Sequence, residues 1–198
     1  MAGLCSGAGT TQMCIMLAVF MGKVLKKKTA VAGDEVTYSL MLRQMQKASA
    51  IQHKGIASRH AYSMDGIDYY CGIRDEDIGI LRQKYDVIIL DISFENTFDN
   101  TNVTFARMVS RLSACDEKIL AGSMLPWKSR ECEKKMERIE RFLDIRGLKM
   151  VTLAACDKEA VSIIKKHGVE VVLIPFERNP FVISGENLRS FLELLKIT

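Results

Sequence analysis

The stretch C-S-G-A-G-T-T-Q-M, residues 5–13, decides how this chain can fold. It places Gly7 and Gly9 just ahead of an apolar run, residues 13–21, that has the composition of a buried helix. A glycine-rich loop that opens a helix gathers backbone N–H groups at the positive end of the helix dipole. The stretch therefore predicts an anion-binding loop between a first strand, compressed into residues 1–5, and a first helix over residues 11–27.

The residues after Gly9 show what kind of anion site this is. A phosphate-binding P-loop reads G-x-x-x-x-G-K-[ST], and its Lys reaches the β- and γ-phosphates. Here Thr10 stands where the Lys is expected, and Thr11 stands where the Mg²⁺-binding hydroxyl is expected. The missing Lys removes the charge that would stabilise a transferred phosphoryl group. We expect phosphate to be held by the loop residues Ser6, Gly7, Ala8, Gly9, Thr10 and Thr11.

The second half of the chain alternates short apolar runs with helical patterns. Residues 87–90 predict a buried strand that ends at Asp91, where a parallel sheet binds its ligands. Further strands and helices follow, with Ser129 and Asp157 as predicted N-caps and Gly147 and Gly168 as predicted helix ends. Such strand–helix units predict an α/β fold in three layers, a mostly parallel sheet with helices on both faces, in a single domain over residues 1–198.

The first half of the chain is less regular. Residues 29–33 predict a weak strand with Asp34 just past it, and residues 67–73 predict an edge strand. Residues 36–60 are ambiguous and could form a helix followed by a short strand.

Composition narrows the class of protein. The chain is 48% apolar and 26% charged with a net charge of +4, which is ordinary for a soluble globular protein and points to no nucleic-acid contact. The longest apolar run, residues 13–21, is well short of the ~20 residues of a transmembrane helix, and the lysines follow it instead of preceding it as in a signal peptide. Six scattered cysteines with no C-x-x-C pair favour reduced thiols in the cytoplasm, with neither zinc nor haem.

Taken in order, these features resemble one known family. The glycine–threonine loop comes first, then Y-D-V-I-I-L-D at residues 85–91, and L-I-P-F-E-R-N-P-F at residues 173–181 precedes the last helix. The layout is similar to the deviant-Walker P-loop ATPases of the MinD/ParA type, including the CpaE-like relatives. The resemblance implies a P-loop NTPase-like fold, a bacterial source, Mg-ATP or ADP as ligand, and a homodimer or a protein partner.

The resemblance also assigns roles to particular positions. Against the family's loop K-G-G-x-G-K-[ST]-[ST], Cys5 replaces the first Lys, Ser6 replaces the first Gly, and Thr10 replaces the second Lys. Thr11 then matches the magnesium-binding Thr, and Asp91 matches the acidic residue that begins the family's second switch and is a candidate ligand for Mg²⁺. Asp34 matches the family's carboxylate after the second strand, loosely, and is a further metal-site candidate.

The differences between this sequence and the family's motifs indicate a protein that has lost catalysis. Both loop lysines are absent, and D-I-S-F-E-N (residues 91–96) replaces the family's D-x-x-G switch. The resemblance therefore implies a pseudo-ATPase that binds nucleotide with weak or no hydrolysis and acts as a regulatory or localisation factor, with no catalytic residue to name. If the chain is an enzyme, it is a slow ATPase.

Two other functions remain open. One is a non-catalytic interaction module of a secretion or pilus assembly that has lost its nucleotide. The more distant one is a dinucleotide-binding Rossmann enzyme, because G-A-G-T-T-Q lacks only the last glycine of that fingerprint and Asp34 lies 25 residues after Gly9. Trp127 is expected either at the edge of the core or in a partner contact. Residues 175–181 form either a rigid turn or, as in the family, a segment near the nucleotide base.

Overall fold

The structure is a computed structural model that describes residues 1–33, 49–51, 60–94, 102–153 and 158–197. The chain divides into two compact units. The first unit comprises Met1–Thr10, Ile92–Arg178 and Ser184–Thr198, and the second comprises Thr11–Asp91 and Asn179–Ile183.

The first unit is built on a five-stranded sheet in which every neighbouring pair of strands is parallel. Ala2 lies opposite Ile92 on one side and opposite Leu120 on the other, so the two-residue first strand is paired along both edges. The strand order is β10 (Glu170–Leu173), β9 (Lys149–Thr152), β8 (Ile119–Ala121), β1 (Ala2–Gly3) and β7 (Ile92–Ser93).

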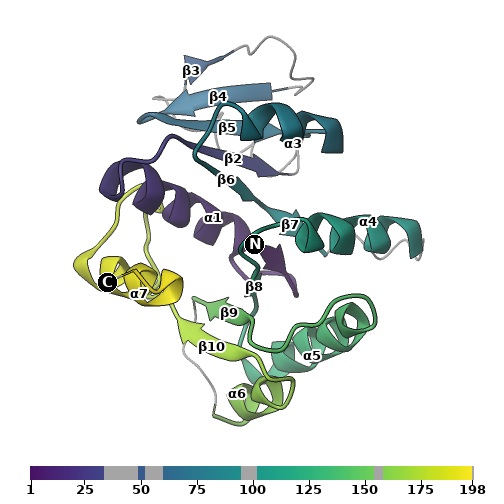
Figure 1. The fold of residues 1–198 in the computed structure, drawn as a ribbon. Helices are drawn as coiled ribbons and strands as arrows, with labels where there is room; N and C mark the ends of the chain where they lie inside the picture. The colour runs from purple at the N-terminus through teal and green to yellow at the C-terminus, as the bar shows by residue number, and fades with distance from the viewer. Residues whose placement is uncertain (34–48, 52–59, 95–101, 154–157, 198) are drawn as a thin grey trace. The chain divides into compact units, whose positions relative to one another are not determined.

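Helices cover both faces of this sheet. In Figure 1, α7 (Gly185–Leu195) lies on one side of the sheet, and α4 (Asn102–Ser113) and α5 (Pro126–Glu140) lie on the other. A fourth helix, α6 (Lys158–Lys165), packs against α5 and β10. The inner stripe of α5 is fully buried, at Cys132, Met136 and Ile139. The sheet is thus the middle layer of three, as the sequence predicts.

The second unit has a mixed sheet. Its order is β3 (Ser49–Ala50), β4 (His60–Met64), β5 (Ile67–Cys71), β2 (Thr29–Gly33) and β6 (Val87–Leu90). Strand β2 pairs in parallel with β5 and β6, whereas β4 runs antiparallel to both β3 and β5. Beside this sheet, the Tyr85 hydroxyl donates to Asp68 Oδ2 at 2.5 Å and lies 2.7 Å from the Tyr70 hydroxyl. The hydrogen bonds satisfy polar groups that would otherwise be costly to bury.

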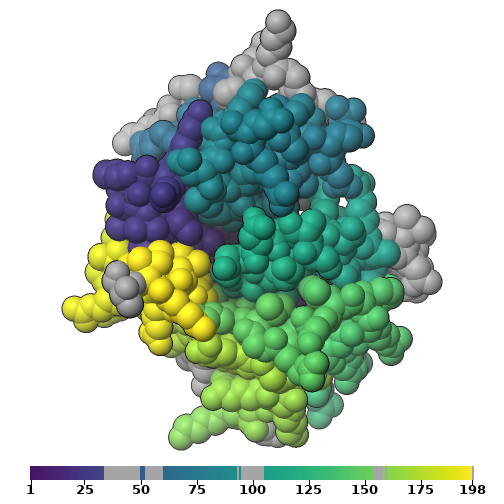
Figure 2. Space-filling view, in the orientation of Figure 1, coloured from purple at the N-terminus to yellow at the C-terminus, as the bar shows by residue number. Residues whose placement is uncertain are grey.

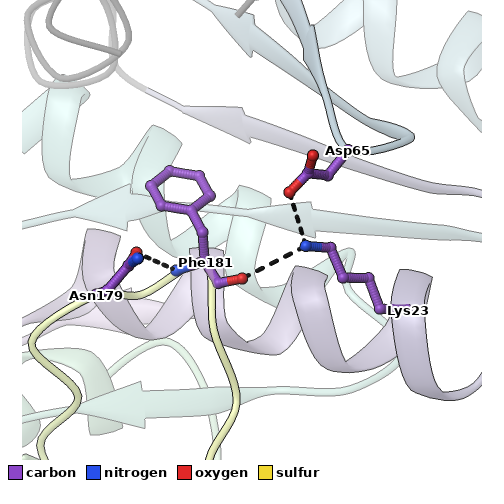
Figure 3. A network of polar contacts seen from close by, with 4 residues as sticks. All are labelled: Lys23, Asp65, Asn179 and Phe181. Atoms are coloured by element: carbon purple, nitrogen blue, oxygen red, sulfur yellow. Dashed lines mark hydrogen bonds and ion pairs between the residues drawn. The ribbon is translucent and has the colours of Figure 1, made fainter. Parts of the chain in front are cut away.

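The first helix, α1 (Thr10–Val19), is continued by a π-helical turn, Phe20–Val24. Side chains from Met13 to Phe20 are all buried, which confirms the prediction of a helix that is apolar on every side. At the end of this helix, the Lys23 ammonium donates to Asp65 Oδ2 at 2.7 Å and to the Phe181 carbonyl at 3.5 Å (Figure 3). The Phe181 ring meets Tyr69 edge-on, so residues 179–183 are fixed to the second unit.

Several sequence predictions are confirmed by these bounds, and three are wrong. Ser129 does not cap α5, because the helix begins at Pro126, whose fixed φ and missing N–H suit a first position, and the Ser129 hydroxyl donates to the Pro126 carbonyl. The same helix ends at Glu140, before Gly147. Strand β5 is paired on both sides and is no edge strand.

Two elements were not predicted, and some predicted features cannot be placed. Strand β4 lacks a strict alternation of apolar residues, and α3 (Asp75–Arg82) has only two turns. Asp34, Asp157 and most of residues 36–60 lie outside the described residues. Within the described part of the chain, no helix is both long and apolar enough to cross a bilayer.

The inner stripe of α5 gives a test of this packing. We expect Met136→Ala to lower the free energy of unfolding by about 2–5 kcal/mol, because it leaves a cavity beneath a fully buried side chain. Lys134→Ala, two residues away on the exposed side of the helix, should change it by less than about 0.5 kcal/mol. Urea unfolding of both variants measures the difference, and equal values would contradict the position of α5.

Candidate functional site

The predicted loop follows β1, which is paired in parallel on both sides. Leu4 continues the contact beyond β1, with its N–H donating to the Ala121 carbonyl at 2.9 Å. The chain then turns through residues 5–9 and enters α1 at Thr10. In parallel α/β sheets, ligands bind beyond the carboxyl ends of the strands, and the loop after β1 lies there.

The loop has the backbone conformation of an anion-binding turn. Gly7 and Gly9 have φ angles of +72° and +76°, and the Ala8 N–H donates to the Cys5 carbonyl at 3.2 Å. Alternating left-handed residues turn neighbouring N–H groups toward one side of the chain, which is how backbone nests hold anions. Ser6 and Gly7 are exposed, so a ligand can reach this part of the loop.

Thr10 takes the place of the P-loop lysine but does not extend as a lysine would. A Cβ placed on Gly3 would lie 2.4 Å from Thr10 Oγ1, so the Thr10 side chain packs directly against the backbone of β1. Its hydroxyl is half-buried at the base of the loop. Thr10 therefore offers the loop an N–H group and no positive charge.

Thr11 and Asp91, both in the second unit, are brought together although 80 residues separate them. The Thr11 hydroxyl donates to Asp91 Oδ2 at 2.7 Å. Asp91 is the single residue between β6 and β7, and its N–H donates to the Ala32 carbonyl at 2.8 Å. A carboxylate and a hydroxyl are the hard oxygen ligands that Mg²⁺ takes from proteins.

The structure describes only part of the larger metal site that the sequence suggests. Asp34 lies outside the described residues. Among the residues that the structure does describe, no group of three or more His, Cys, Asp or Glu side chains gathers as metal ligands would.

Cys5, at the position of the family's first loop lysine, is fully buried and belongs to a thiol pair. The Cys132 thiol of α5 donates to the Ser123 carbonyl at 3.8 Å. Hydrogen bonding between the two thiols lowers the pKa of Cys5, although burial opposes the shift. The same hydrogen bond, with burial, raises the pKa of Cys132. Both thiols lie at the Ser123 carbonyl, just after β8. Sequence reasoning treated the cysteines as separate apolar residues and missed this pair, since nothing in their spacing connects them.

Two other sequence features are now placed. Trp127 is 73% exposed in the first turn of α5, which excludes the interpretation that it lies at the edge of the core. The space-filling view shows α5, in green, at the surface of the molecule (Figure 2). Within residues 175–181, Phe181 is buried in the second unit while Phe176 is 65% exposed.

Comparison with known proteins relates this geometry to a fold. No protein-family model matches the chain, and no curated protein matches it in sequence. Solved structures do match. The cell division ATPase MinD of Pyrococcus furiosus superposes with a TM-score of 0.60 at 16% identity, over 98% of this chain and 96% of that one.

Two further structures give the same result. A putative plasmid partition protein of Borrelia burgdorferi, bound to AMPPNP, matches with a TM-score of 0.61 at 15% identity over 99% of this chain and 95% of that one. The MinD of the Aquifex aeolicus MinC:MinD complex matches with a TM-score of 0.60 at 14% identity, over 96% and 85% of the two chains. The chain thus has the fold of the MinD/ParA-type P-loop ATPases, which confirms the family resemblance at the level of fold.

The loop glycines give a matched pair of variants. Alanine at either position must adopt a left-handed φ, which costs about 1–2 kcal/mol. At Gly9 the new Cβ would also lie 2.3 Å from Leu153 Cδ1, whereas at Gly7 it meets nothing within 4 Å. We expect Gly9→Ala to destabilise by about 1 kcal/mol or more beyond Gly7→Ala. Urea unfolding compares them, and a larger loss for Gly7→Ala would contradict the loop conformation.

The contact between Thr11 and Asp91 can be tested by a double-mutant cycle. Thr11→Val keeps the shape of the side chain but removes the donor, so we expect a loss of about 1–2 kcal/mol of unfolding free energy. That loss should largely vanish in an Asp91→Ala background, which has no side-chain acceptor for the Thr11 hydroxyl. Thr11→Ser, which keeps the hydroxyl, is the control. Additive effects of the two changes would mean that the hydrogen bond contributes nothing.

Proposed function

We propose that this protein binds ATP or ADP with Mg²⁺, hydrolyses it weakly or not at all, and acts as a regulatory or localisation factor. The observation that carries the proposal is the local geometry. A loop with two left-handed glycines leads from β1, a strand paired in parallel on both sides, into a helix, and the second residue of that helix, Thr11, is hydrogen-bonded to Asp91.

The loop residues Ser6 to Thr11 would bind phosphate through the backbone. Their N–H groups lie at the start of a ten-residue helix, and the left-handed residues Gly7 and Gly9 give the loop its concave turn. Thr11 and Asp91 supply oxygen ligands for Mg²⁺, which would bridge phosphate oxygens and reduce their charge. Asp34 is retained as a third candidate ligand. The Borrelia neighbour, which has the same fold, was solved with AMPPNP, an observation that supports a nucleotide as the ligand.

The side chains at the two lysine positions support weak or absent hydrolysis. Cys5 is buried and hydrogen-bonded to Cys132, and Thr10 packs on the backbone of Gly3. Neither brings a positive charge to a γ-phosphate, and this charge supplies much of the rate in phosphoryl transfer. A pseudo-ATPase that signals by binding is the function that fits these residues.

A second candidate function is a protein-interaction module that has lost its nucleotide. Trp127, 73% exposed, favours it, because exposed aromatic residues are concentrated in protein interfaces. One neighbour was solved as a complex of MinD with MinC. Under either candidate we propose a bacterial, cytoplasmic, CpaE-like protein that forms a homodimer or binds a protein partner. The interaction module would act in a secretion or pilus assembly.

Thermal unfolding with and without nucleotide tests the proposal. ATP or ADP with Mg²⁺, at about 100 times its dissociation constant, should stabilise the protein by about 2.7 kcal/mol, which raises the melting temperature by a few degrees. Gly9→Asp should abolish the shift, because it puts a negative charge and a clashing side chain in the loop. NAD should give no shift. Stabilisation by neither ATP nor ADP would favour the interaction module.

A further inference from the structure

The loop lacks a cation of its own, so the helix that packs against its base is the first place to look for one. That helix is α5. It begins five residues after β8, which pairs with β1, and its Cys132 side chain reaches Cys5 at the start of the loop. Both segments belong to the first unit. The side of α5 that carries Cys132 is therefore directed toward the start of the loop, just after the end of β1.

Lys128 lies on that face, one helical turn before Cys132. Residues four apart lie above one another on a helix, so Lys128 stands on the same side as Cys132. It is nearer the start of α5, which follows the carboxyl end of β8 and so lies at the same edge of the sheet as the loop. The charges of Lys128 and of its neighbour Glu131 both reach Cys5. The hydrogen bond with Cys132 dominates in lowering the pKa of Cys5, burial opposes it, and of the two charges Glu131 raises this pKa more than Lys128 lowers it.

The ammonium group of Lys128 is held by a neighbour on its own helix. Its Nζ atom lies 3.2 Å from Glu131 Oε2, and the two side chains are 29% and 35% exposed. An ion pair this accessible is weak, so Lys128 can leave the Glu131 carboxylate for a more highly charged anion such as a phosphate group, and can return to it. In the absence of ligand, the ammonium group is therefore paired within the first two turns of α5.

We propose that Lys128 is the cation that contacts the phosphates of the bound nucleotide, in place of the lysines that the loop has lost, and that Glu131 holds it when the loop is empty. This inference rests on the proposed nucleotide binding. It assigns a binding role to a residue outside the loop. A lysine acts as a flexible point charge, so a different attachment point on the chain can serve the same phosphate.

Three variants of α5 test the proposal by calorimetric titration with ADP, ATP and inorganic triphosphate at fixed ionic strength. Lys128→Met should weaken all three by about tenfold or more, since a charge-assisted contact to phosphate is lost. Glu131→Gln should tighten them about two- to threefold, because it removes the competitor. Lys134→Met, which takes the same charge from the exposed side of α5, should change them less than about twofold.

The outcomes separate this inference from the function on which it rests. If the unaltered protein binds neither nucleotide nor triphosphate, both fall. If it binds them and Lys128→Met binds equally well, or Lys134→Met loses as much, the role of Lys128 is refuted and nucleotide binding stands. Melting temperatures without ligand show that each variant is folded. Should Lys128→Met fail to fold, Lys128→Gln and the tightening by Glu131→Gln decide the question.

Discussion

The pairing of β1 with strands on both sides is the constraint on which the rest of the site depends. Two residues cannot hold a strand by themselves, but Ala2 and Gly3 are bracketed by β7 and β8 in a parallel register. Because the strands are parallel, their carboxyl ends meet at one edge, and the chain must leave β1 there. The glycine loop, the Cys5–Cys132 contact and the start of α5 all lie where this register puts them.

Close packing at the base of the loop explains why Cys5 and Thr10 suit the two positions at which the family has lysines. Gly3 has no side chain and so leaves room for Thr10. The thiols of Cys5 and of Cys132 in α5 fill the space between the start of the loop and that helix. Long charged side chains would be costly to bury in these places unless each were paired. A short hydroxyl and a thiol form tight contacts there instead. The loop keeps a backbone suited to phosphate while its own side chains carry no positive charge.

Helix α5 has a buried side and an exposed first turn. Its inner stripe of Cys132, Met136 and Ile139 is fully buried, and its first turn carries Trp127, which is exposed, and Lys128, which pairs with Glu131. One short segment therefore joins the sheet core, the phosphate loop and an exposed aromatic side chain. A ligand that engages Lys128 would also affect the turn that carries Trp127, which links nucleotide binding to a surface that a partner can contact.

The sequence by itself determined the class of fold and the place of the glycine loop between β1 and α1. Apolar runs such as residues 87–90 and the glycines before α1 carry local signals, because strand burial and left-handed turns depend on neighbouring residues. The three-layer arrangement with its parallel strands followed from these signals. The sequence matched Thr11 and Asp91 to two motif positions of the family but did not predict the hydrogen bond between them. The register of β2 with β6 accounts for where Asp91 lies. Only the tertiary structure decided that Cys5 meets Cys132, that Trp127 is exposed and that Lys128 pairs with Glu131 on the helix that carries Cys132. The contact between Cys5 and Cys132 joins residues more than a hundred positions apart, and sheet register and helix packing, which no local pattern records, bring them together.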